Sequence, residues 1–251
     1  MAIKRYWVVG AFCIVILAGC AETRRVLQEH RLDKSGFLGH DLYEKLTAGD
    51  ETQLEPAFRW RNEQVALKQY TKILIDPVIL YRQPQDTGGG YSNEEAQILL
   101  DYLHTRTVEE ISKYVTVVEK PTTGAMRLHV ALTDYEQTWV AMDMISTLHP
   151  VGRVIAEATG LAVEKPSFVG GAQIEYKLID SVSGKILAAG IDRRVGGKTL
   201  GKGFSRWADV RGAMDYWALQ AAYRLCMAMG QSNCARPTYG AMGFLGTETP
   251  K

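Results

Sequence analysis

The strongest constraint on the fold is a pair of strand-like segments between residues 172 and 194, joined by a short polar turn. In the first segment, Ile174, Tyr176 and Leu178 alternate with polar side chains, which is the pattern of a strand with one buried face. The turn reads Asp-Ser-Val-Ser-Gly over residues 180–184, and residues 185–194 form the returning segment. These segments predict a β-hairpin.

Other strands and two helices are expected around this hairpin. Residues 70–80 contain an apolar run that predicts a strand buried on both faces, with Pro77 at its end or on an edge, because proline lacks an amide hydrogen. Residues 114–118 predict a short strand, and residues 126–133 alternate between apolar and polar side chains. A helix that begins at Ser92 or Asn93 carries the apolar stripe Ala96, Leu99, Leu100, Leu103, Thr107 and Ile111. A second helix carries the stripe Trp207, Val210, Met214, Trp217, Ala221 and Leu225.

The order of these elements predicts an α+β fold. We expect a single domain with a mixed β-sheet and two main helices packed on one face of it. Residues 139–162 are expected to form a crossover with one or two helical parts, because Pro150-Val151-Gly152 interrupts any single helix.

The N-terminus resembles the signal sequence of a bacterial lipoprotein. Lys4 and Arg5 precede an uncharged, mostly apolar segment that ends in Leu-Ala-Gly-Cys at Cys20. The apolar segment is shorter than the roughly 20 residues that a spanning helix needs. We therefore expect cleavage after residue 19 and lipid attachment to Cys20, with plain secretion and an uncleaved helix as the alternatives. Ala21 resembles the residue of the outer-membrane class, which predicts the inner leaflet of the outer membrane, facing the periplasm.

The mature chain would keep two cysteines, Cys226 and Cys234, with seven residues between them. In an oxidising periplasm, such a pair favours a disulfide between the end of the last helix and the segment after it. Two inert buried thiols are the alternative. Zinc would need further ligands, and no nearby cysteine or histidine supplies them.

The domain organisation follows from these features. We expect a cleaved signal peptide over residues 1–19, a lipidated tether with a docking segment over 20–55, the α+β domain over 56–236 and a flexible tail over 237–251. Within the tether, Phe37, Leu38, Leu42, Tyr43 and Leu46 have a spacing that suggests one or two helical turns docked on the domain. A solvated linker is the alternative for this segment.

The sequence lacks the residue patterns that carry common catalytic or metal chemistry. The five histidines show no HExxH or similar ligand spacing, and no serine lies in a G-x-S-x-G motif. Residues 195–199 depart from a phosphate loop, because Asp192 stands where the first glycine is required. The carboxylate pairs at 94–95 and 109–110 lie at helix ends, where the helix dipole explains them. We therefore expect no catalytic residue, no metal site and no cofactor beyond the covalent lipid on Cys20.

The charge of the chain argues against a nucleic-acid partner, and one basic segment is a candidate partner surface. The formal net charge of +1 is too small for a nucleic-acid-binding protein, which usually presents a clearly basic face. A glycine-rich segment carries five basic residues, Arg193, Arg194, Lys198, Lys202 and Arg206. It is expected to be a solvated loop that could also meet anionic lipid headgroups or an acidic partner.

Several short motifs resemble the bacterial lipoprotein family catalogued as domain of unknown function 3313. The motifs are Ser35-Gly36-Phe37-Leu38, Ile75-Asp76-Pro77-Val78, Glu175 to Asp180 with Ser183-Gly184, and Trp207 with Asp215, Trp217 and Ala218. The predicted topology is also similar to periplasmic lipoprotein domains of the curli-secretion channel subunit, the penicillin-binding-protein activator type and the Tol-system β-propeller protein. The resemblance implies a role in binding protein partners, often as an oligomer, and supplies no catalytic residues.

The sequence thus predicts a lipoprotein that binds another envelope protein through a non-catalytic domain, with self-association as a further option. Two alternatives belong to other classes. One is an envelope hydrolase whose carboxylates meet only in the fold, and the other is a carrier of a small apolar ligand.

Overall fold

The computed structural model describes residues 24–25, 34–81, 93–136, 171–195, 208–239 and 245–248. The predicted signal peptide, Cys20, the crossover at 139–162 and the cations Lys198, Lys202 and Arg206 lie outside these residues. The described helices are α1 (His40–Tyr43), α2 (Asn93–Ile111) and α5 (Ala208–Ala228), with short 3-10 helices at Glu51–Gln53 and Leu67–Gln69. The strands are β1 (Arg24–Arg25), β2 (Thr47–Ala48), β3 (Phe58–Arg61), β4 (Lys72–Ile75), β5 (Ile79–Leu80), β6 (Thr116–Val117), β7 (Ala125–Glu136), β8 (Gly171–Asp180), β9 (Ile186–Val195), β10 (Arg236–Tyr239) and β11 (Leu245–Glu248).

Nine of the described strands form one mixed sheet in the order β2-β3-β9-β8-β7-β4-β6, with β1 beside β9 and β5 beside β7. Strand β4 runs parallel to both β6 and β7. In the centre of the sheet, β8 runs antiparallel to both β7 and β9. The predicted hairpin is therefore confirmed as β8 and β9. It occupies the middle of the sheet.

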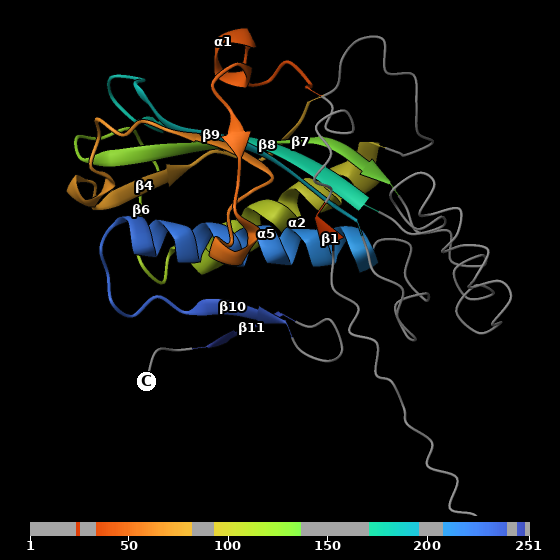
Figure 1. Ribbon diagram of the computed structural model, residues 1–251. Helices are drawn as coiled ribbons and strands as arrows, with labels where there is room; N and C mark the ends of the chain where they lie inside the picture. Colours follow the sequence, from red (N-terminus) through yellow and green to blue (C-terminus); the bar gives the residue numbers. More distant parts are fainter. Residues whose placement is uncertain are drawn as a thin grey trace, which may run out of the picture.

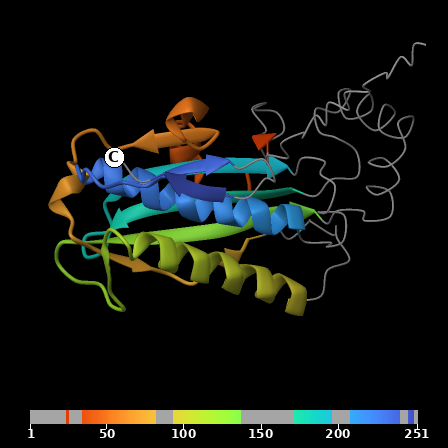
Figure 2. The same ribbon diagram turned by 90° about the horizontal axis from the view of Figure 1, so that it is seen from below.

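The two long helices pack side by side on one face of this sheet (Figure 1). Their apolar stripes face inward: all six predicted stripe residues of α2 are buried, as are Val210, Met214, Trp217 and Leu225 of α5. Figure 2 shows both helices covering the sheet when the molecule is seen from below. The predicted α+β fold with two main helices on one face is confirmed. None of the described helices combines the length and apolar character needed to cross a bilayer.

The segment around α1 covers the opposite face of the sheet (Figure 1). Leu38, Leu42 and Tyr43 form a second hydrophobic cluster with Ala189 and Ile191 of β9. Of the two interpretations of this segment, the docked one therefore describes residues 34–46. The expected domain start at residue 56 is too late, because β2 already pairs with β3.

The C-terminal region is stapled to α5. A disulfide joins Cys226 and Cys234, whose Cα atoms lie 5.6 Å apart. Strand β10 follows the staple, lies along the outer side of α5 and pairs with β11. The expected flexible tail from residue 237 is thus wrong for the described strands, because the disulfide brings residue 236 beside the helix and a second strand is available to pair with it.

Candidate functional site

A pocket with a cavity volume of about 150 Å³ lies between the sheet and the two long helices, and it opens to solvent where Arg59 and Arg224 line it. Its walls are mostly apolar and include Ile73, Leu103, Ile111, Leu128, Val130 and Ile174. Protein interiors are normally packed with few voids larger than a water molecule. An apolar cavity of this size can take up benzene, so the core has room for a small ligand.

Small side chains keep this space open. Ala188 on β9 and both Ala221 and Ala228 on α5 line the cavity. A larger apolar side chain at any of them would occupy part of it. The periodicity of the sequence places Ala221 correctly on an inward stripe, but an apolar pattern does not report the volume left between helix and sheet.

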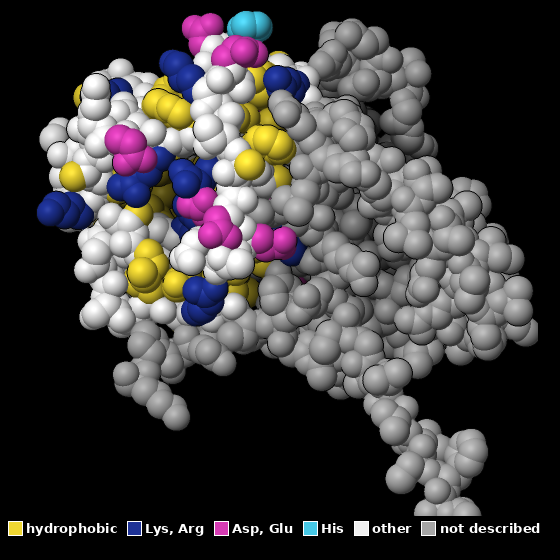
Figure 3. All heavy atoms as spheres, viewed as in Figure 1, with side chains coloured by type: hydrophobic (Ala, Val, Ile, Leu, Met, Phe, Trp, Pro, Cys, Tyr) yellow, Lys and Arg dark blue, Asp and Glu magenta, His cyan; other side chains and the backbone are white. Residues whose placement is uncertain are grey.

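Three arginines line the same cavity, Arg59 and Arg61 on β3 and Arg224 on α5. The carboxylate of Glu55 lies 2.5 Å from Arg59 Nε and 3.3 Å from Arg224 Nη1, so it links β3 to the helix. Burial raises the pKa of Glu55, but hydrogen bonds from the Asp50 amide and Arg59, together with both nearby guanidinium charges, bring it below its ordinary value. On the face shown in Figure 3, basic and acidic side chains lie next to hydrophobic ones.

Arg61 differs from the other two arginines of the cavity. Its Nε atom is buried and has no hydrogen-bond acceptor among the described residues. A buried donor without a partner costs about 1–3 kcal/mol. The cavity wall therefore combines apolar side chains with one buried guanidinium N–H that has no acceptor among the described residues.

Asp192 of β9 forms a buried polar anchor at the cavity wall. Its carboxylate accepts hydrogen bonds from the Ala57 amide at 2.8 Å and from Trp217 Nε1 at 2.7 Å. Asp192 is fully buried, and the Arg194 guanidinium lies 3.8 Å away. One carboxylate thus holds α5, the segment before β3 and the central hairpin together.

Arg193 and Arg194 belong to the returning strand predicted for residues 185–194, so their interpretation as part of the solvated loop is wrong. Strand β9 continues through both, because β8 pairs with it over this length and β1 pairs with its end. Arg193 forms an ion pair with Asp134, and Arg194 stacks over the Tyr216 ring at 3.6 Å. Arg194 is only 1% exposed. These two cations stabilise the interior and are not part of a basic partner surface.

On the other face of the sheet, Glu175 fastens the docked segment. It is fully buried and accepts hydrogen bonds from the Ser35 amide at 3.0 Å and from the Tyr43 hydroxyl at 2.6 Å. Burial raises the pKa of Glu175. Burial also raises the pKa of Tyr43 to about 12, and its hydrogen bond to Glu175 acts in the same direction. Lys177, on the same face, donates to the Phe37 carbonyl at 3.0 Å.

Asp76, which follows the end of β4, contacts two basic side chains. Its carboxylate lies 2.7 Å from His129 Nδ1 and 2.9 Å from Arg127 Nε. Burial lowers the pKa of His129, and the charges of Arg127 and Lys177 act in the same direction against the attraction of Asp76. A carboxylate and a histidine in contact can exchange a proton. Within the described ranges, no three His, Cys, Asp or Glu side chains lie together in a way that could hold a metal ion.

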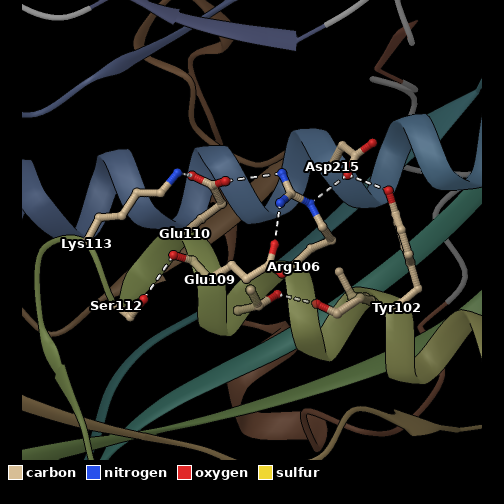
Figure 4. A network of polar contacts seen from close by, with 9 residues as sticks. Tyr102, Arg106, Glu109, Glu110, Ser112, Lys113 and Asp215 are labelled. Atoms are coloured by element: carbon tan, nitrogen blue, oxygen red, sulfur yellow. Dashed lines mark hydrogen bonds and ion pairs between the residues drawn. The ribbon is translucent and has the colours of Figure 1, made fainter.

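A network of partly buried polar contacts joins α2 to α5 (Figure 4). Arg106 contacts Asp215 at 3.0 Å and Glu110 at 3.1 Å, and Tyr102 donates to Asp215 at 2.8 Å. Burial and the Asp215 carboxylate raise the pKa of Tyr102 to about 12. The helix dipole does not explain the pair at 109–110, because α2 ends at residue 111 and its C-terminus disfavours negative charge. Ion pairs offset these charges instead.

The fold and the cavity define a class: a single α+β domain with helices on one sheet face and a small apolar core cavity. The chain belongs to the family described as protein of unknown function (DUF3313), whose model matches residues 33–221. No curated protein matches the chain.

Solved structures show more distant similarity. The PelC dodecamer from Paraburkholderia phytofirmans is 10% identical, with a TM-score of 0.37, over 69% of this chain and 97% of that one. A DUF4136 family protein from Bacteroides thetaiotaomicron is 9% identical, with a TM-score of 0.33, over 68% of this chain and 95% of that one. A putative neuraminyllactose-binding hemagglutinin homolog from Helicobacter pylori is 9% identical, with a TM-score of 0.28, over 68% of this chain and 88% of that one.

Proposed function

We propose that this protein is a lipid-anchored lipoprotein of the cell envelope whose domain binds another envelope component without catalysis. The observation that carries the proposal is the pairing of β1 with β9. Strand β1 begins at Arg24, four positions after the expected lipid attachment site at Cys20.

This pairing limits how far the domain can move from the membrane. A fully extended chain covers at most about 3.6 Å per residue, so four residues span roughly 14 Å. An acylated Cys20 would therefore hold one corner of the sheet close to the lipid surface. Confinement of this kind raises the effective concentration of a membrane-bound partner and strengthens modest contacts.

The internal polar groups support a binding role. Asp192, Glu175 and Asp215 each hold separate elements of the fold together through the contacts described above. A rigid domain of this kind can present a constant surface to a partner, which in our proposal is an envelope protein or a second copy of this chain.

The anchor is tested by replacing Cys20 with Ala in cells and following membrane fractionation and the mass of the protein. We expect the variant to lose its acyl mass and to leave the membrane fraction or remain unprocessed. Cys13→Ala is the matched control, because Cys13 lies in the segment that is removed. Unchanged fractionation and mass for Cys20→Ala would contradict the proposal.

The location and the partner need two further measurements. Ala21→Asp should move the protein from the outer to the inner membrane in a density gradient. Crosslinking in cells, with the Cys20→Ala variant as the comparison, should capture a reproducible envelope partner only for the anchored form. Equal capture by both forms would separate partner binding from anchoring and count against the tethering mechanism.

A further inference from the structure

We infer that the core cavity is a binding site for a short apolar molecule with one anionic head group, in the simplest case an alkyl carboxylate. This inference goes beyond the anchored binding role, because it assigns a small-molecule site to the space between the sheet and the two long helices. Its test needs neither the anchor nor a protein partner, so the two proposals can fail separately.

The apolar part of the ligand is defined by the cavity walls. The space of about 150 Å³ is lined by aliphatic side chains from four strands and two helices. The apolar side chains around such a space lack packing partners on one side. An apolar group of about six carbons restores those contacts, since cavities of this size accept benzene.

The head group is defined by the arginines. Arg59 and Arg61 lie two positions apart on β3, so their side chains start from the same face of the strand. Arg224 approaches from α5, and Glu55 is shared between Arg59 and Arg224. Three guanidinium groups thus line an apolar space, and the single carboxylate of Glu55 offsets only part of their positive charge.

Arg61 gives a second observation, separate from the shape of the cavity, that points to a missing hydrogen-bond acceptor. Its buried Nε has no acceptor among the described residues, and a guanidinium is matched in geometry by a carboxylate that accepts two parallel hydrogen bonds. A ligand carboxylate at the arginines would satisfy this donor while its alkyl chain fills the cavity. A neutral head group could satisfy only part of this site, and a cationic one would be repelled.

The test uses three probes with the same number of carbon atoms: octanoate, octan-1-ol and octylammonium. Binding to the mature chain is measured by titration calorimetry, with Cys20→Ser so that no attached acyl group competes. We expect octanoate to bind at least about tenfold more tightly than octan-1-ol, because a hydrogen bond to a charged group contributes about tenfold or more. Octylammonium should bind more weakly than both.

Two substitutions separate the head site from the chain site. Arg61→Gln should remove most of the preference for octanoate over octan-1-ol, while Arg211→Gln, an arginine stacked near Tyr102 and not among the cavity-lining residues, should leave it unchanged. Ala221→Leu should weaken all three probes together by filling the cavity, and Ala228→Leu gives a second version of this change if the first variant does not fold.

Glu55 provides the most discriminating variant. Its carboxylate competes with the ligand for Arg59 and Arg224, so Glu55→Gln should bind octanoate severalfold more tightly and leave octan-1-ol unchanged. Equal affinity for the three head groups, or octanoate binding that persists in Ala221→Leu and Ala228→Leu, would overturn the assignment.

Discussion

The two faces of the central sheet are both buried, but they are buried by different chemistry. The helix face is large and apolar, and it leaves a cavity between strands β7 to β9 and the helices. The docked face is small, and the hydrogen bonds of Glu175 to residues 35 and 43 fasten it. The large apolar layer on the helix face therefore tolerates an unfilled volume, whereas the small layer on the docked face depends on a few hydrogen bonds.

The largest expected effect comes from Asp192, because it belongs to both sides of the comparison. Asp192→Ala removes the acceptor of the Ala57 amide and Trp217, and it takes away one of the carboxylates near the buried Arg194, which keeps Glu51 at 3.6 Å. Breaking a buried charged contact of this kind costs about 3–5 kcal/mol. Denaturant unfolding should show this loss. Asp192→Asn keeps the shape and removes only the charge, so its loss measures the share that is due to the charge. An unchanged free energy of unfolding for Asp192→Ala would contradict the anchoring role.

The disulfide belongs to the helix side alone. Replacing Cys226 and Cys234 together by Ser should lower the free energy of unfolding by about 2–3 kcal/mol, because a short closed loop no longer restrains the unfolded chain. Hydrogen exchange should speed up in β10 and at the end of α5. Residues 38–43 on the docked face should keep their protection, and a similar change there would show that the two faces are not independent.

Glu175 tests the docked face through pH. Burial raises its pKa above the ordinary value of 4.5, so between these two values the native state binds more protons than the unfolded state. The contribution of Glu175 to stability therefore rises as the pH falls through this window. The free energy of unfolding of the wild type, minus that of Glu175→Gln, should increase as the pH falls through the same window. A difference that is constant with pH would contradict the raised pKa.

The smallest expected effect comes from two adjacent residues of β9 whose side chains point to opposite faces of the sheet. Ala188 lines the cavity on the helix side, whereas Ala189 is fully buried in the docked cluster. Ala188→Val should be neutral or stabilise by up to about 1 kcal/mol, because it fills space. Ala189→Val should destabilise by about 1–3 kcal/mol through overpacking. Thermal unfolding of the two variants measures the contrast directly, and equal shifts would mean that the two faces are packed alike.

The sequence predicted the helix side of the fold well, because local periodicity reports it. The stripe from Ala96 to Ile111 and the alternation from Met126 to Leu132 both describe residues that are buried in the structure. Each pattern depends on neighbours within one helix or one strand, and the hydrophobic effect acts on every repeat of it.

The docked face and the cavity could not be predicted in the same way. Gln173 and Glu175 look like the solvated side of a strand, yet both are fully buried, and the segment that contacts Glu175 lies 140 residues away in the chain. The burial of Arg193 and Arg194 could not be predicted, because their partners, Asp134 and Tyr216, are distant in the chain. The cavity depends on unfilled volume, which no residue pattern encodes.

The pairing of β1 with β9 gives the molecule a mechanical consequence. If the protein is anchored at Cys20 while a partner holds the domain, tension enters through β1 and passes by main-chain hydrogen bonds into β9. Strand β9 is also the strand that carries Asp192 and Ala188 at the cavity wall. A pull on the anchor would therefore load the strand that forms part of the cavity wall, and it would reach α5 through the contact of Arg194 with Tyr216.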